Sequence, residues 1–85
     1  MVELEIGFVL INVEPGKEKK VYNSLIDSDE IAEVYPLFGE YDLIAKVVAQ
    51  DSEKLSEVIF NVIRRIDGVK KTKTLPSARY KIGVK

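Results

Sequence analysis

The residues with the clearest capacity for chemistry lie in one short stretch, Gly39-Glu40-Tyr41-Asp42. Glu40 and Asp42 place carboxylates on either side of Tyr41, and carboxylates can hold an ammonium group. The stretch falls where a turn is expected, and the backbone N–H groups of a turn can bind an anion. The alternative interpretation is that Gly and Asp stand here simply as turn formers.

Two hydroxyl groups are candidates for a second set of contacts. Thr72 and Thr74 share one side of an expected strand, so their hydroxyls could bind a ligand carboxylate. Threonine is also common in strands for its β propensity alone, and that alternative stays open.

The most basic part of the chain comprises Arg64, Arg65, Lys70, Lys71 and Lys73. It could bind phosphate, or it could be a solvated face whose charges protect a sheet edge. Because the formal net charge of the whole chain is −1, the pattern favours the solvated face.

Composition excludes several classes of function. The chain has no cysteine and no histidine, which removes disulfides, thiolate metal sites, the commonest metal ligand and the usual base near neutral pH. No second group with a tuned pKa accompanies the carboxylates. We therefore expect no enzyme, no metal site and no cofactor.

Charge and hydropathy also limit the location and partners. A net charge of −1 gives no long-range attraction to nucleic acid or to an anionic membrane. No apolar run reaches the roughly 18 residues of a membrane span, and the start lacks the basic region of a signal peptide. We expect a cytoplasmic protein, and abundant Lys and Glu with few amides hint at a thermophilic source.

Apolar patterning predicts the elements that must position these residues. Apolar β-branched runs indicate strands, and apolar stripes at helical spacing indicate two amphipathic helices. The expected elements are a strand at 6–13, a helix at 17–28, strands at 31–38 and 43–49, a helix from 51 to about 66, a strand at 69–75 and a short strand or extended tail at 78–84. This order predicts a single α+β domain over 1–85, a ferredoxin-like sandwich whose antiparallel sheet carries two helices on one face.

One face of this sheet would remain without helices. The first strand is apolar on both sides, so either Val9 and Ile11 or their neighbours must face outward. A bare apolar sheet face predicts an interface, and we therefore expect a dimer. Pro36 cannot donate to a strand ladder, which places the strand at 31–38 at a sheet edge or at a bulge.

Other proteins with this strand order fit the residues less well. Residues 7–12 are similar to the shorter motif of an RNA-recognition domain, but those domains stack bases on aromatic residues of the third strand. The expected third strand at 43–49 has no aromatic residue. Heavy-metal chaperones need paired cysteines, and no Gly-rich phosphate loop is present.

Three segments together resemble the ligand-sensing domain (RAM domain) of Lrp/AsnC transcriptional regulators. The stretch 39–47 resembles the family signature of Gly, any residue, an aromatic residue, Asp and an apolar strand. Residues 68–75 are similar to the family's Gly-Val and Thr-x-Thr ending, and 13–16 to its entry into the first helix. The resemblance covers roughly residues 6–75.

The resemblance implies a function and its residues. Family members pair through their sheets into dimers, assemble further into rings such as octamers, and bind amino acids in clefts between dimers. Turn N–H groups would then hold an α-carboxylate, and Asp42 or Glu40 an α-ammonium. Gly39 would let the backbone approach the ligand. The ligand-binding residues implied are Gly39, Glu40, Tyr41, Asp42, Thr72 and Thr74.

One departure from the family limits the resemblance. Full-length regulators carry an N-terminal helix-turn-helix domain, whereas the first expected strand here starts within a few residues of Met1. We therefore expect a stand-alone sensor that does not bind DNA directly and that could join full-length Lrp/AsnC regulators in mixed assemblies.

Three rival functions remain open at this point. The chain could be a structural assembly module without ligand, or an ACT-like regulatory subunit of an amino-acid biosynthetic enzyme. A small catalyst such as a dimeric α/β-barrel oxygenase is disfavoured by the missing histidines.

Overall fold

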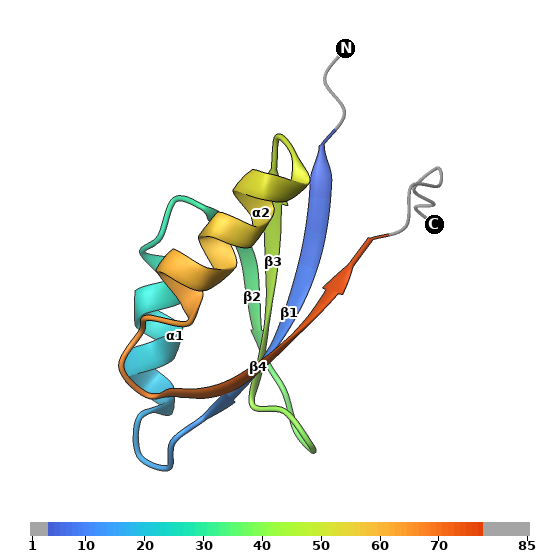
Figure 1. Ribbon diagram of the computed structural model, residues 1–85. Coiled ribbons are helices and arrows are strands. Elements are labelled where there is room, and N and C mark those ends of the chain that lie inside the picture. Colours follow the sequence, from blue (N-terminus) through green and yellow to red (C-terminus); the bar gives the residue numbers. More distant parts are fainter. Residues whose placement is uncertain (1–3, 78–85) are drawn as a thin grey trace.

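The computed structural model describes residues 4–77, and these form the predicted β-α-β-β-α-β order (Figure 1). The elements are β1 (Glu5–Val13), α1 (Glu18–Ile26), β2 (Ile31–Pro36), β3 (Leu43–Ala49), α2 (Ser52–Val58), the π-helical turn η1 (Ile59–Ile63) and β4 (Val69–Pro76). The further strand or tail expected at 78–84 lies outside the described residues. No helix among residues 4–77 is long and apolar enough to cross a membrane.

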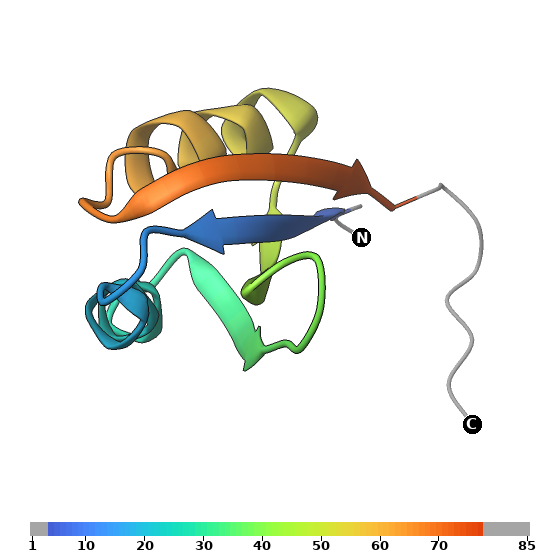
Figure 2. The same ribbon diagram turned by 90° about the horizontal axis from the view of Figure 1, so that it is seen from below.

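The four strands form one antiparallel sheet in the order β2-β3-β1-β4. β1 is central, and Ile11 pairs with Leu43 on one side and with Thr72 on the other. Both helices lie on one side of the sheet (Figure 1), and Figure 2 shows the twist that sets β2 and β4 at a clear angle. The predicted ferredoxin-like α+β fold is confirmed.

The core lies between the sheet and the helices. Val9 and Ile11 of β1 are fully buried there, against the buried Val21 and Leu25 of α1 and Ile63 of η1. Alternation along β1 therefore turns the neighbours of Val9 and Ile11 outward, and Phe8 is 37% exposed. The open face, a term kept for the sheet side without helices, carries Ile6, Phe8, Leu10, Tyr35, Ile44, Val48 and Leu75.

Pro36 ends β2, which is an edge strand with an irregular pairing to β3 between Ile31 and Glu33. The edge position predicted from Pro36 is confirmed. Its physical reason is that an edge strand leaves one row of N–H groups unpaired, so a missing N–H costs nothing there.

The second helix differs from the uniform helix expected over 51 to about 66. Its start is as predicted, because the Asp51 carboxylate accepts a hydrogen bond from the Lys54 N–H at 2.7 Å. After Val58 the backbone widens into η1, where the Arg64 N–H donates to the Ile59 carbonyl at 3.0 Å. That bond spans five residues, so the last part of the helix is a π turn.

An ion-pair cluster joins the start of α1 to the segment before β4. Asp67 accepts bonds from Lys17 at 3.2 Å and from Lys20 at 2.7 Å. The Lys20 and Lys17 ammonium groups hold the pKa of Asp67 below its ordinary value. Because the cluster is exposed, its contribution to stability is small and sensitive to salt.

The lowered pKa of Asp67 predicts part of the acid sensitivity. A carboxylate whose folded pKa lies below its unfolded value of roughly 3.9 stabilises the fold above that pH and loses the effect as pH falls through the folded pKa. We expect the urea midpoint of the parent chain to fall more steeply below about pH 4 than that of Asp67→Asn, at low ionic strength. Parallel profiles for the two proteins would contradict this assignment.

Candidate functional site

The loop between β2 and β3 carries the predicted site, and it is tied at its base and open at its tip. The Leu37 N–H donates to the Asp42 carbonyl at 2.9 Å, and the Asp42 N–H donates to the Ile11 carbonyl at 2.9 Å. Phe38, Gly39 and Glu40 are exposed, and the loop projects beyond the end of the sheet (Figure 1). The fixed base positions a tip that is free to contact another molecule.

Asp42 has a structural contact that the sequence did not reveal. Its Oδ2 accepts a hydrogen bond from the Val13 N–H at 2.8 Å. Val13 lies just past the β1–β3 pairing, which ends at Ile11, so the carboxylate supplies the acceptor that the ladder no longer provides. A carboxylate has about four acceptor positions, so a contact between Asp42 and a ligand ammonium stays a prediction beside this structural bond.

Gly39 adopts φ +114°, and a Cβ built on it would meet no atom within 4 Å. This conformation is one that L side chains rarely adopt, which explains glycine here. The open space above Gly39 is compatible with a ligand that approaches the backbone, and this role of Gly39 stays a prediction. Glu40 is exposed next to it, and Tyr41 is half-buried.

The two threonines lie across β1 from this loop. Thr72 pairs with Ile11 and Thr74 with Val9, so both half-buried side chains are on the helix side of the sheet. Leu43, which follows the loop, pairs with Ile11 from the other side. Two strand spacings, roughly 10 Å, therefore separate Thr72 from Leu43. Within one chain the fold does not bring the threonines and the loop together.

A groove beside the loop was not identified from the sequence. It encloses about 380 Å³ between α1 and the ends of the strands, and we call it the α1 groove. Its floor is mainly apolar and its rim is charged; the lining residues are Glu18, Lys19, Tyr22, Pro36, Leu37, Asp42 and Leu43. The available signal was Tyr22, whose half-buried ring extends the apolar stripe of α1 toward the strands.

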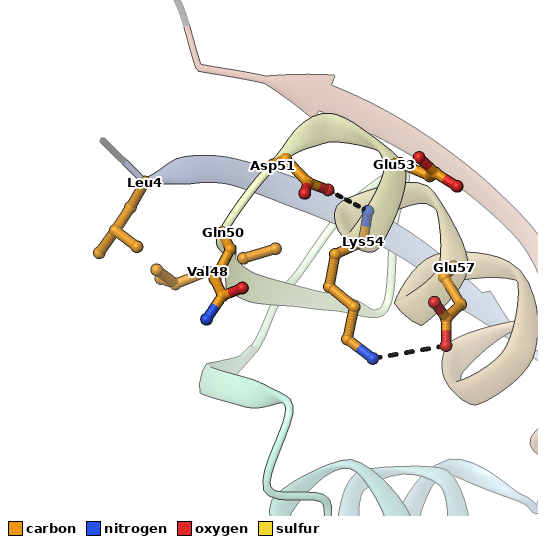
Figure 3. Close-up of a pocket in the computed structure, with 8 residues that line it drawn as sticks. Leu4, Val48, Gln50, Asp51, Glu53, Lys54 and Glu57 are labelled. Carbon is orange, nitrogen blue, oxygen red and sulfur yellow. Dashed lines mark hydrogen bonds and ion pairs between the residues drawn. The ribbon is translucent and has the colours of Figure 1, made fainter. Parts of the chain in front are cut away.

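A second cavity of about 510 Å³ lies beside the start of α2 (Figure 3). Two of the three carboxylates that line it have partners: Asp51 accepts from the Lys54 N–H, and Glu57 accepts from the Lys54 ammonium at 3.4 Å. Among residues 4–77, no three side chains that favour metals gather closely enough to hold an ion. The cavity therefore shows no constellation suited to a metal.

The basic stretch does not form one anion site. Lys71 and Lys73 are exposed on β4 and pair with Asn12 and Leu10, which places them on the open face. Arg64 lies in the helix layer instead, with its guanidinium 5.0 Å from the ring centre of Phe60. This division agrees with the solvated face that the net charge favoured.

A polar cluster stands among the apolar residues of the open face. Lys46 pairs with Glu33 at 3.2 Å, and the Tyr35 hydroxyl donates to the same carboxylate. The Tyr35 hydroxyl and then the Lys46 ammonium hold the pKa of Glu33 below its ordinary value, and the Glu33 contact raises the pKa of Tyr35. The ion pair gives the Lys46 ammonium and the Glu33 carboxylate a partner of opposite charge on a mainly apolar surface.

Comparison with known proteins places this geometry in a family. Residues 6–80 match the model of the Lrp/AsnC ligand binding domain. The HTH-type transcriptional regulator FL11 of Pyrococcus abyssi is 39% identical over 70 residues, which are 82% of this chain and 46% of that protein. The chain thus spans about half the length of this curated relative.

Solved structures agree with the family match. The structure of AsnC from E. coli superposes with a TM-score of 0.86 at 26% identity, over 95% of this chain and 55% of that one. The crystal structure of FFRP-DM1 gives 0.83 at 32% identity, over 87% of this chain and 99% of that one. The chain belongs to the Lrp/AsnC ligand binding domain family.

Proposed function

We propose that this chain is a non-catalytic sensor that binds an α-amino acid at the loop between β2 and β3 and assembles with further copies of itself. The observation that carries the proposal is the construction of that loop. Its base is fixed by the bonds of Leu37 and Asp42, while Gly39 and Glu40 present open backbone and a free-standing carboxylate. Such a loop can offer N–H donors to a carboxylate and an acceptor to an ammonium group.

The roles within this site follow from the contacts. Asp42 holds Val13 through Oδ2, so it would orient the loop and share an ammonium through its remaining acceptor positions. Glu40 has the greater exposure and is the better candidate for the main ammonium contact. Thr72 and Thr74 lie on the far side of β1, so they would contribute from a neighbouring copy in the assembly.

The sensor would act on transcription through its relatives. FL11 is an HTH-type transcriptional regulator with a segment similar to this chain. A shared fold and sheet surface would let this chain enter mixed assemblies with full-length Lrp/AsnC regulators and make them responsive to its ligand. A pull-down from native extract with the tagged chain tests this part of the proposal. If it recovers no full-length Lrp/AsnC regulator, the mixed assemblies are contradicted.

The test of amino-acid binding is the urea midpoint of the pure protein with each amino acid at millimolar concentration. A ligand present at about 100 times its Kd should add roughly 2.7 kcal/mol per site. We expect one chemical class of amino acid to raise the midpoint, and Glu40→Gln to remove the rise. Urea is preferable to heat because a very stable protein can be too difficult to melt.

Glu53→Gln is the matched control, since Glu53 is also exposed but lines the cavity beside α2. It should retain the full ligand effect. Should no amino acid move the midpoint while the protein remains a discrete oligomer, the sensor assignment fails and the purely structural assembly module replaces it.

A further inference from the structure

The α1 groove and the β2–β3 loop share two residues, and this joins the groove to the proposed amino-acid site. Leu37 and Asp42 both line the groove. The same two residues fix the base of the loop, since the Leu37 N–H donates to the Asp42 carbonyl at 2.9 Å. The groove therefore begins where the loop begins, whereas the cavity beside α2 is lined by the ends of β1 and β3 and by the start of α2.

A bound α-amino acid has a fixed geometry around its ammonium group. In a contact with Asp42, the ligand nitrogen lies about 2.8 Å from a carboxylate oxygen. The ligand Cα lies roughly 1.5 Å beyond that nitrogen, so the side chain starts within roughly 5 Å of the carboxylate. Because Asp42 itself lines the groove, a side chain on this Cα can enter the groove without a movement of the loop.

The walls of the groove decide which side chains it accepts. The groove encloses about 380 Å³, which lies within the roughly 300–1,000 Å³ of small-molecule pockets. The ring of Tyr22 and the side chains of Pro36, Leu37 and Leu43 give it apolar walls. Each CH₂ group of a ligand that is buried against such walls raises the affinity about fourfold.

The charges at the rim do not favour a charged side chain. Glu18 and Lys19 are neighbours on α1, and both are exposed beside the groove. Their opposite charges nearly cancel at a distance, so together they attract neither a cationic nor an anionic side chain strongly. Asp42, the third charged residue of the lining, holds the Val13 N–H and the ligand ammonium. An ionised side chain in the groove would lose water and gain no partner on the apolar floor.

We propose that the α1 groove holds the side chain of the bound amino acid and selects α-amino acids with a long, uncharged, apolar side chain. This assignment rests on the proposed amino-acid binding and adds the class of ligand to it. The selection takes place within one chain, because the groove and the loop belong to the same copy.

Tyr22 and Leu37 are the residues that determine the specificity. Leu37 is 37% exposed and Tyr22 is half-buried, so both present surface that a ligand can cover. Leu43 is only 4% exposed and belongs to the core. Leu37 supports the loop through its backbone N–H. A serine at position 37 therefore keeps the bond that fixes the loop and removes the apolar wall.

The affinities of four amino acids test the ligand class. The urea midpoint of the parent chain, measured at several concentrations of each ligand, gives the Kd. L-leucine has three more carbon atoms than L-alanine and should bind about 50-fold more tightly. L-norleucine and L-lysine share a four-carbon side chain and differ by the terminal ammonium. Norleucine should bind at least about 10-fold more tightly than lysine.

Groove variants test the place where the side chain binds. Leu37→Ser should reduce the preference for leucine over alanine about 10-fold and leave the Kd of alanine nearly unchanged. Tyr22→Ser gives an independent test from the α1 side of the groove. Phe60→Ser is the matched control, because Phe60 is an exposed apolar residue of the helix layer outside the groove. It should keep the parental ranking of the four ligands.

Two different failures can be told apart. If no amino acid moves the midpoint, binding itself is absent, and the proposed function fails together with the ligand class. If amino acids bind but alanine or lysine binds as tightly as leucine and norleucine, the proposed function stands and the ligand class is overturned. If Leu37→Ser and Tyr22→Ser both keep the parental ranking, the groove is not the site of the ligand side chain.

Discussion

Gly68→Ala should lower the free energy of unfolding by about 3 kcal/mol, a large part of the roughly 5–15 kcal/mol of a typical domain. Gly68 is buried at φ +107°, where α1 meets the start of β4. A Cβ there would lie 2.9 Å from Lys17 Cβ and 2.9 Å from Val21 Cγ2. The first is fixed to the helix backbone and the second belongs to a fully buried core residue, so neither can move away cheaply.

Gly68→Ala combines two costs, the backbone strain of a positive φ and the steric overlap of the added Cβ with α1, and a second glycine of the chain separates them. Gly16 also has a positive φ, +87°, but a Cβ on it would meet nothing within 4 Å. Gly16→Ala should therefore show the backbone strain alone, about 1 kcal/mol. Urea unfolding of the three proteins measures both values.

The difference between the losses of unfolding free energy in Gly68→Ala and Gly16→Ala measures the steric overlap between the alanine methyl group at position 68 and α1. If both variants lose the same free energy of unfolding, α1 moves to accommodate the added methyl group, and the close contacts at position 68 have no measurable cost. The Gly68 carbonyl also accepts the Glu14 N–H at 2.8 Å. A shift of α1 away from an alanine at 68 would strain this bond as well, which adds to the expected loss.

The sequence was sufficient for the fold because each element carries its own periodic signal. The strand expected at 43–49 is β3, and its alternate residues Leu43, Ala45, Val47 and Ala49 are all buried on the helix side. The π turn after Val58 was not predictable in the same way. A bond from Arg64 to Ile59 differs from a normal helical bond by one residue, and the apolar spacing is compatible with both.

The site was predictable as a segment but not as a set of contacts. Asp42 was identified by its position in a signature, yet its bond to Val13 depends on how far β1 extends beyond its pairing with β3. The α1 groove joins residues from α1, the end of β2 and the start of β3, which only tertiary packing brings together. Separation of Thr72 from the loop likewise follows from the strand order, which places β1 between them.

Phe8→Glu should abolish association through the open face while the single chain still folds. Phe8 pairs with Lys46 on β3 and with Leu75 on β4, so it stands in the middle of the apolar surface. It is 37% exposed, and Lys46 beside it would give a new carboxylate a partner in the separate chain. In a dimer formed through this face, two such carboxylates would be buried near each other across the axis.

The expected loss is large because charge burial is costly. Each carboxylate removed from water without full compensation costs several kcal/mol, so the Kd of the dimer should rise roughly 1,000-fold or more. Light scattering after size exclusion, over a range of concentrations, measures the change. Phe60→Glu, at an exposed aromatic of the helix layer, should leave the parent mass unchanged. If Phe8→Glu keeps the parent mass, the chains associate through other surfaces. An interface over the open face would have to bury both new carboxylates, and the cost of that burial would separate the two chains.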